Sequence, residues 1–213
     1  MALWELLYPE NPLATIEPAG DDADVQGWNS DSAAFEWVFS KYMPKTIIEV
    51  GSWKGASAIH MAKLAPEADI LCVDTWLGSI ESWVPERGGE YKDMYDSLRL
   101  KHGYPQIYYT FASNVVKHVG RERICPMPMP SSEAARMLAQ RGMTADFIYI
   151  DGSHAYEDVK RDLRDYWPLV RVGGFLMGDD YAWDDVRKAV HSFFRAVDSV
   201  IDGKYIVRKW KDD

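Results

Sequence analysis

The stretch "FIYIDGSHAYEDVKRDL" (147–163) changes character at Asp151, where an apolar run gives way to an acid and a polar loop. The apolar run predicts a short, fully buried strand, and the spacing of apolar residues after the loop predicts a helix. The stretch "VGGFLMGDDY" (172–181) has the same design, because its apolar run ends at Asp179 and Asp180. Buried strands that alternate with helices are typical of a parallel sheet covered on both faces.

The same alternation extends through the rest of the chain. We expect strands at 46–50, 69–74, 123–128, 146–151 and 173–180, helices at 31–43, 55–65, 107–119, 131–141, 155–170 and 184–197, and a hairpin at 199–210. The predicted fold is α/β: a Rossmann-like, doubly wound, mainly parallel sheet of seven strands with a C-terminal antiparallel hairpin. We expect one domain over 1–213, in which 1–45 form an irregular lead-in and a helix, and 75–105 form a loop that covers the site and contains one short helix near 91–100.

The overall composition, 47% hydrophobic and 27% charged, is that of an ordinary globular protein. The net charge of −9 argues against a nucleic-acid partner, whose backbone is itself negative. The two cysteines offer no zinc-binding spacing and suit a reducing compartment. The sequence shows neither a signal-peptide pattern nor an apolar run of membrane length, so we expect a cytoplasmic protein without membrane contacts. Assembly into a homo-oligomer is compatible with the sequence.

A glycine-containing turn follows the first expected strand in "EVGSWKGAS" (49–57). Gly51 permits a sharp turn and Gly55 opens a helix with free N–H groups, so that a ligand can approach the backbone. Trp53 stands within the turn, which departs from the dinucleotide-binding pattern and favours a ligand without phosphate. Asp74 ends the second strand, where an acid can bind both hydroxyls of a ribose. A plain turn and a solvated acid are the alternative, but the two features together favour a nucleoside ligand.

Three carboxylates, Asp151, Asp179 and Asp180, end two expected strands. They would repel one another if the strands were neighbours, and a hard cation such as Mg²⁺ or Ca²⁺ would relieve the repulsion. Helix capping is the alternative for each acid alone, whereas three acids at two strand ends favour a metal. His154 follows Asp151 by three residues, and could take a proton from a substrate hydroxyl beside the metal.

Four stretches together resemble the class I S-adenosylmethionine-dependent methyltransferases: "IIEVGSWKGAS" (47–57), "CVDTW" (72–76), 147–163 and 172–181. They are most similar to the metal-dependent O-methyltransferases, in the branch of macrocin-type sugar methyltransferases and cephalosporin-hydroxylase-like proteins. The resemblance covers about 46–194. It implies S-adenosylmethionine and a divalent cation (Mg or Ca) as cofactors, a small-molecule hydroxyl as acceptor, and direct methyl transfer.

The resemblance also implies roles for single residues. The cofactor would contact Glu49, Gly51, Ser52, Trp53, Gly55, Ser57, Asp74, Thr75, Trp76, Ser131, Ser132 and Asp151. The metal would bind Asp151, Asp179 and Asp180, and His154 would be the base where the catechol enzymes have a lysine, with Asp158 as a lesser candidate. Two alternatives stay open: a catalytically silent relative that binds the cofactor or a partner, and a nucleotide-sugar or NAD-binding enzyme, which would prefer a richer glycine loop.

Overall fold

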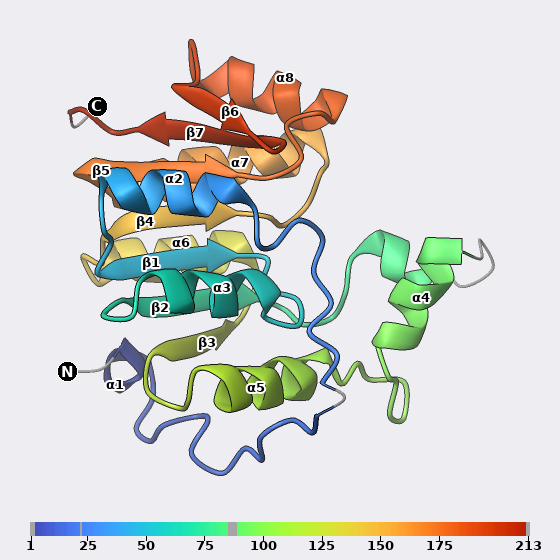
Figure 1. Cartoon of the computed structure of the whole chain (residues 1–213). Coiled ribbons are helices and arrows are strands. Elements are labelled where there is room, and N and C mark those ends of the chain that lie inside the picture. The colour runs from blue at the N-terminus through green and yellow to red at the C-terminus, as the bar shows by residue number, and fades with distance from the viewer. Residues whose placement is uncertain (1–2, 22, 85–88, 212–213) are drawn as a thin grey trace.

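The computed structural model describes residues 3–21, 23–84 and 89–211, and is built around one seven-stranded sheet (Figure 1). The strand order is β3-β2-β1-β4-β5-β7-β6. The strands are β1 (Thr46–Val50), β2 (Asp69–Asp74), β3 (Ile124–Pro128), β4 (Ala145–Ile150), β5 (Val170–Gly178), β6 (Ser199–Ile201) and β7 (Lys204–Arg208). The first five pair in parallel, and β7 runs antiparallel to β5 and β6. The predicted fold class is therefore confirmed.

Helices cover both faces of the sheet, because side chains that alternate along each strand point to opposite faces. On β1, Ile47 packs into one apolar cluster and Ile48 into the other. The first cluster receives α2 (Ala33–Lys41), α3 (Ala56–Leu64) and α5 (Ile107–His118). The second receives α1 (Leu3–Leu7), α6 (Ser131–Gln140), α7 (Tyr156–Tyr166) and α8 (Asp184–Phe193).

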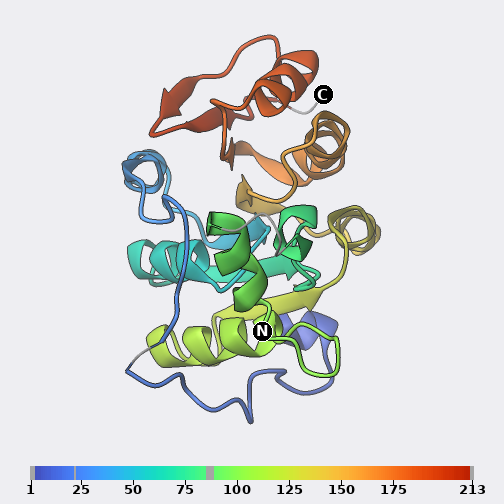
Figure 2. The same cartoon turned by 90° about the vertical axis from the view of Figure 1, so that its right-hand side faces the viewer.

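The carboxyl ends of the central strands lie at one edge of the sheet. Val50 of β1 pairs with Ile150 of β4, and Ile150 pairs with Gly178 of β5. The residues that follow these three strands are therefore neighbours. The helix α4 (Gly89–Ser97) stands off the same edge, to the right in Figure 1 and toward the viewer in Figure 2.

Several predicted boundaries differ from the observed ones. The lead-in expected to be irregular contains α1, whose Leu3 is buried against the sheet. The helix expected at 155–170 ends at Tyr166 and continues as a short 3₁₀ turn (Trp167–Leu169), because Pro168 has no N–H to extend an α-helix. The expected cover, 75–105, contains α4 close to where its short helix was expected, and also a 3₁₀ helix (Ile80–Trp83) that was not expected. Residues 85–88 lie outside the described residues.

Helix length also bears on the expected absence of membrane contacts. Within the described ranges, no helix combines enough length with enough apolar character to cross a membrane.

Candidate active site

The turn after β1 requires a glycine at position 51. Gly51 has φ +88°, and a Cβ at this position would lie 1.9 Å from the carbonyl oxygen of Asp151. No L-residue with a side chain fits that space. The end of β1 and the first residue after β4 are thus in direct backbone contact.

The Asp74 carboxylate holds the same turn in place. Its Oδ2 accepts the backbone N–H groups of Ser52 and Trp53, each at 2.9 Å, and its Oδ1 accepts that of Trp76 at 2.7 Å. Burial raises the pKa of Asp74, while the backbone hydrogen bonds oppose that shift. The backbone N–H of Thr75 also stabilises this carboxylate. Asp74 therefore has a structural role in the turn that the sequence did not indicate, in addition to the ribose contact predicted for it.

The Glu49 carboxyl lies beneath the turn and is fully buried. It accepts a hydrogen bond of 2.5 Å from the Ser57 hydroxyl and a longer one, 3.5 Å, from the Cys72 thiol. Burial raises the pKa of Glu49 to about 7. Glu49 and Ser57 therefore bond to each other beneath the turn, and the Glu49 carboxyl has no exposed surface at which it could contact a ligand.

The side chain of Trp76, for which a contact with the cofactor is predicted, lies in the core. Its side chain is 2% exposed and packs against Phe111, with ring centroids 4.8 Å apart. Its indole N–H donates to the Trp53 carbonyl at 2.8 Å. The left-handed backbone at both tryptophans, φ +46° at Trp53 and +51° at Trp76, directs the chain into this arrangement. The hydroxyl of the neighbouring Thr75 accepts the N–H of Leu77.

Ser131 and Ser132 begin α6, at the end of β3. The Ser131 hydroxyl donates to Asp162 of α7 at 2.6 Å, and its carbonyl accepts the Tyr166 hydroxyl. Ser131 thus connects two helices, whereas Ser132 is half-buried. Both residues lie at the predicted edge of the sheet. The Ser131 hydroxyl is engaged in the contact between helices, and that of Ser132 is not.

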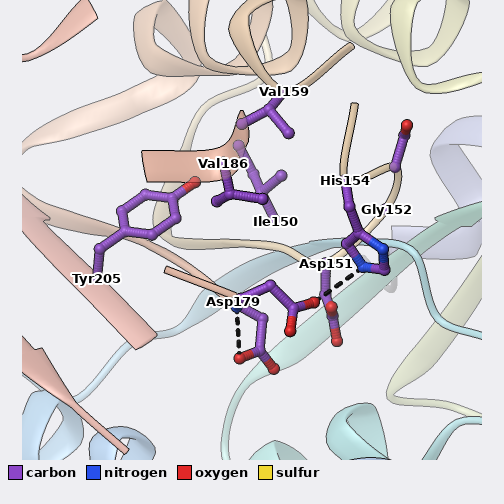
Figure 3. A pocket seen from close by; sticks show the side chains of 10 residues that line it. Ile150, Asp151, Gly152, His154, Val159, Asp179, Val186 and Tyr205 are labelled. Atoms are coloured by element: carbon purple, nitrogen blue, oxygen red, sulfur yellow. Dashed lines mark hydrogen bonds and ion pairs between the residues drawn. The ribbon is translucent and has the colours of Figure 1, made fainter. Parts of the chain in front are cut away.

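The three predicted metal-binding acids do converge, as Figure 3 shows for Asp151 and Asp179 in one pocket. Burial and the nearby Asp179 and Asp180 raise the pKa of Asp151 to about 8. The three differ in their partners, however. One oxygen atom each of Asp151 and Asp180 and one nitrogen of His154 lie within 4.8 Å of one another, and Asp179 is not part of this group.

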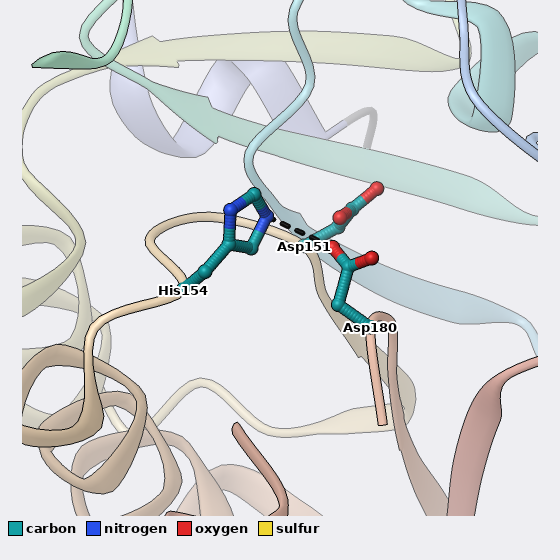
Figure 4. Close-up of side chains that lie close together, drawn as sticks. All are labelled: Asp151, His154 and Asp180. Atoms are coloured by element: carbon teal, nitrogen blue, oxygen red, sulfur yellow. Dashed lines mark ion pairs between the residues drawn. The ribbon is translucent and has the colours of Figure 1, made fainter. Parts of the chain in front are cut away.

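His154 points toward the same two acids (Figure 4). Its Nε2 lies 2.9 Å from Oδ2 of Asp180, and its ring packs against Trp183 with centroids 4.8 Å apart. The hydrogen bond with Asp180 raises the pKa of His154, because a carboxylate stabilises the imidazolium form. In the neutral ring, a proton on Nε2 leaves the lone pair on Nδ1, which suits a proton acceptor. Asp158 instead bonds to Ser153 and Arg161.

Sequence reasoning missed two buried residues beside the acids, Tyr149 and Lys204. The Lys204 ammonium forms an ion pair with Asp179 and donates to the Tyr149 hydroxyl at 3.0 Å. That hydroxyl lies 2.8 Å from Asp179 and 3.1 Å from Asp151. A lysine directly after a hairpin turn is normally solvated, so the sequence carried no sign of its burial.

A second buried lysine, Lys54, connects the glycine turn to the segments around it. Its ammonium pairs with Asp24, and it donates to Gln26 at 3.0 Å and to the Ser97 hydroxyl of α4 at 2.9 Å. Trp28 of the N-terminal segment packs near Trp53, with ring centroids 6.2 Å apart. The N-terminal segment and α4 of the expected cover are therefore both connected to the turn.

Residues 48–181, more than half of the chain, match the family model of a methyltransferase domain. The chain belongs to this family. It is a class I methyltransferase that uses S-adenosylmethionine, so the predicted family resemblance is confirmed. The match sets aside the alternative of a nucleotide-sugar or NAD-binding enzyme.

Two known proteins are similar to this methyltransferase over most of its length. It is 24% identical to the 8-demethyl-8-(2,3-dimethoxy-alpha-L-rhamnosyl)-tetracenomycin-C 4'-O-methyltransferase of Streptomyces olivaceus, over 90% of this chain and 80% of that protein. The crystal structure of CalS11, a calicheamicin methyltransferase, superposes with a TM-score of 0.58 at 18% identity, over 82% of this chain and 77% of that one. At this identity the structural likeness shows a shared fold.

A shorter match is to a protein whose name gives a different class of substrate, a tRNA. The methyltransferase is 32% identical to a tRNA (guanine-N(7)-)-methyltransferase of Mycobacterium tuberculosis, but over only 75 residues, which are 34% of this chain and 24% of that protein. The chain thus covers about a quarter of that relative.

Proposed function

We propose that this methyltransferase transfers the methyl group of S-adenosylmethionine to a hydroxyl of a small molecule, such as a sugar, natural product or phenol, with the help of a divalent cation. One observation carries the proposal: the backbone of the Gly51 turn touches that of Asp151, so the cofactor turn adjoins the group formed by Asp151, His154 and Asp180. The similarity to the tetracenomycin-C 4'-O-methyltransferase of S. olivaceus, over 90% of this chain, supports the choice of acceptor atom.

The turn offers a fitting place for the methionine end of the cofactor. Gly55 precedes α3 with φ +91°, and no side chain caps the helix. Free N–H groups at a helix start favour a carboxylate. Gly51, Ser52, Trp53 and Gly55 would hold this end, and the Asp74 carboxylate would bind the ribose.

The acids fit a divalent cation. Asp151 and Asp180 bring two negative charges together, and the raised pKa of Asp151 reflects in part that unfavourable proximity. Burial is the largest cause of that shift, followed by the charge of Asp179 and then that of Asp180. Carboxylate oxygens of this kind suit Mg²⁺ or Ca²⁺. A bound cation would lower the pKa of an acceptor hydroxyl.

His154 would then act as the base. Asp180 fixes the imidazole ring by its hydrogen bond to Nε2, and Nδ1 takes the proton of the acceptor hydroxyl. Trp183 holds the other side of the ring. The protein otherwise supplies position, since a well-oriented pair of reactants needs little further assistance. Exposed rings of Trp28, Trp83 and Trp183 would cover the acceptor together with α4.

The test is formation of S-adenosylhomocysteine in the presence of glycoside and phenol acceptors, with and without EDTA. We expect turnover that EDTA abolishes, while calorimetry shows that much of the affinity for S-adenosylmethionine is kept. Binding of the cofactor without turnover on any acceptor would favour a catalytically silent protein. Turnover that survives EDTA would remove the metal from the proposal and leave methyl transfer in place.

A further inference from the structure

Because of the buried lysine on β7, the three acids at the strand ends differ in their interaction partners. Lys204 is fully buried, and its ammonium lies over the Tyr149 ring, 5.3 Å from the centroid. A buried ammonium needs a counter-ion, because removing it from water is costly. Asp179 is that counter-ion.

Both oxygen atoms of Asp179 already have partners inside the protein. Its Oδ2 accepts from Lys204 and lies 2.8 Å from the Tyr149 hydroxyl, and its Oδ1 accepts the backbone N–H of Asp180 at 2.8 Å. A cation that bound Asp179 would have to compete with the Lys204 ammonium for the same carboxylate.

Among the residues that the structure describes, the side chains of the other two acids are engaged at one oxygen only. The side-chain contact of Asp151 is made by Oδ2, to Tyr149, and that of Asp180 by Oδ2, to His154. Asp180 has φ +55°, a left-handed conformation that aspartate tolerates, and the turn sets its side chain apart from that of Asp179. Two carboxylates with a free oxygen therefore face His154, and the third faces Lys204.

We propose that Lys204 is a positioning residue for the cation site. It keeps Asp179 in a buried ion pair, so that a divalent cation binds through Asp151 and Asp180 and leaves its other positions to water and to acceptor oxygens. Mg²⁺ commonly binds in this way, with one or two carboxylates and several waters. This inference rests on the proposed function, because it assumes the cation.

The experiment measures binding of Mn²⁺ by the loss of its free EPR signal, in the full chain without acceptor. Asp180→Asn should weaken Mn²⁺ binding at least about tenfold, since it removes a charged ligand. The charge-balanced pair Asp179→Asn with Lys204→Gln should stay within about threefold of wild type, since no ligand is lost. Lys204→Gln alone should strengthen binding about tenfold or more, because it removes a nearby positive charge and releases Asp179.

A double variant as weak as Asp180→Asn would overturn the inference and make Asp179 a ligand, while leaving the proposed cation in place. If wild type binds no Mn²⁺, both the inference and the proposed cation fail, and the EDTA assay then decides whether methyl transfer stands without it. Circular dichroism checks that each variant folds. Should the double variant not fold, anomalous scattering from Mn²⁺ in wild-type crystals decides: an Asp179 oxygen bound to the ion would overturn the inference.

Discussion

The carbonyl oxygen of Asp151 occupies the space in which a side chain on Gly51 would begin, 1.9 Å from the position of its Cβ. Gly51→Ala should therefore push the ends of β1 and β4 apart. Gly120→Ala is a matched control, because Gly120 also has positive φ (+96°) but meets no atom within 4 Å. The control should cost about 1–2 kcal/mol of unfolding free energy, and Gly51→Ala clearly more. Urea denaturation measures both, and equal losses would contradict the steric argument.

Asp74→Ala should weaken both the fold and the binding of the cofactor. Three backbone N–H groups lose their acceptor, which should lower the unfolding free energy by about 2–4 kcal/mol. Loss of a charge-assisted ribose contact should weaken S-adenosylmethionine binding about ten- to a hundredfold. Asp69→Ala, at the opposite end of β2, is the control. Calorimetry on folded variants gives the affinity, and unchanged binding would remove the ribose role from Asp74.

His154→Gln should lower the rate of methyl transfer about a hundred- to ten-thousandfold, as expected when a general base is removed. Cofactor binding should hardly change. His191→Gln is the control, since His191 bonds to Tyr181 on an exposed part of the surface. Single-turnover rates and Mn²⁺ affinity are both measured. If the affinity fell together with the rate, His154 would be a metal ligand rather than the base.

Glu49 should make stability depend on pH. Its pKa rises from 4.5 to about 7 on folding, so the unfolded chain ionises first as the pH increases. The contribution of Glu49 to stability therefore falls between about pH 4.5 and pH 7, on the order of 3 kcal/mol in total, and is constant above that range. Glu49→Gln should flatten the profile, and Glu67→Gln, an exposed change, should not. Urea denaturation across this range tests the prediction, and parallel profiles for wild type and Glu49→Gln would contradict it.

The strand ends could be predicted because each central strand is an apolar run that stops at a glycine or an acid, as at Gly51 and Asp151. Parallel strands end at one edge, so convergence of the acids followed from the fold class. The burial of Lys204 could not be predicted. It depends on which strand of the hairpin pairs with β5, and the sequence pattern of a hairpin does not determine that pairing. The burial of the Trp76 side chain could not be predicted for a similar reason, because the left-handed backbone at this residue leaves no periodic signal in the sequence.

The position of β7 between β5 and β6 has a consequence for biosynthesis. Asp151 and Asp179 leave the ribosome before Lys204, so a nascent chain already contains both acids while their counter-ion is still missing. Long-range pairing of this kind forms late, because the intervening chain must first be ordered. An unfinished sheet would leave like charges unpaired next to its core, and insertion of β7 would bring the charge that balances them. The lysine thus makes the final assembly of the sheet and the maturation of the acidic site a single event.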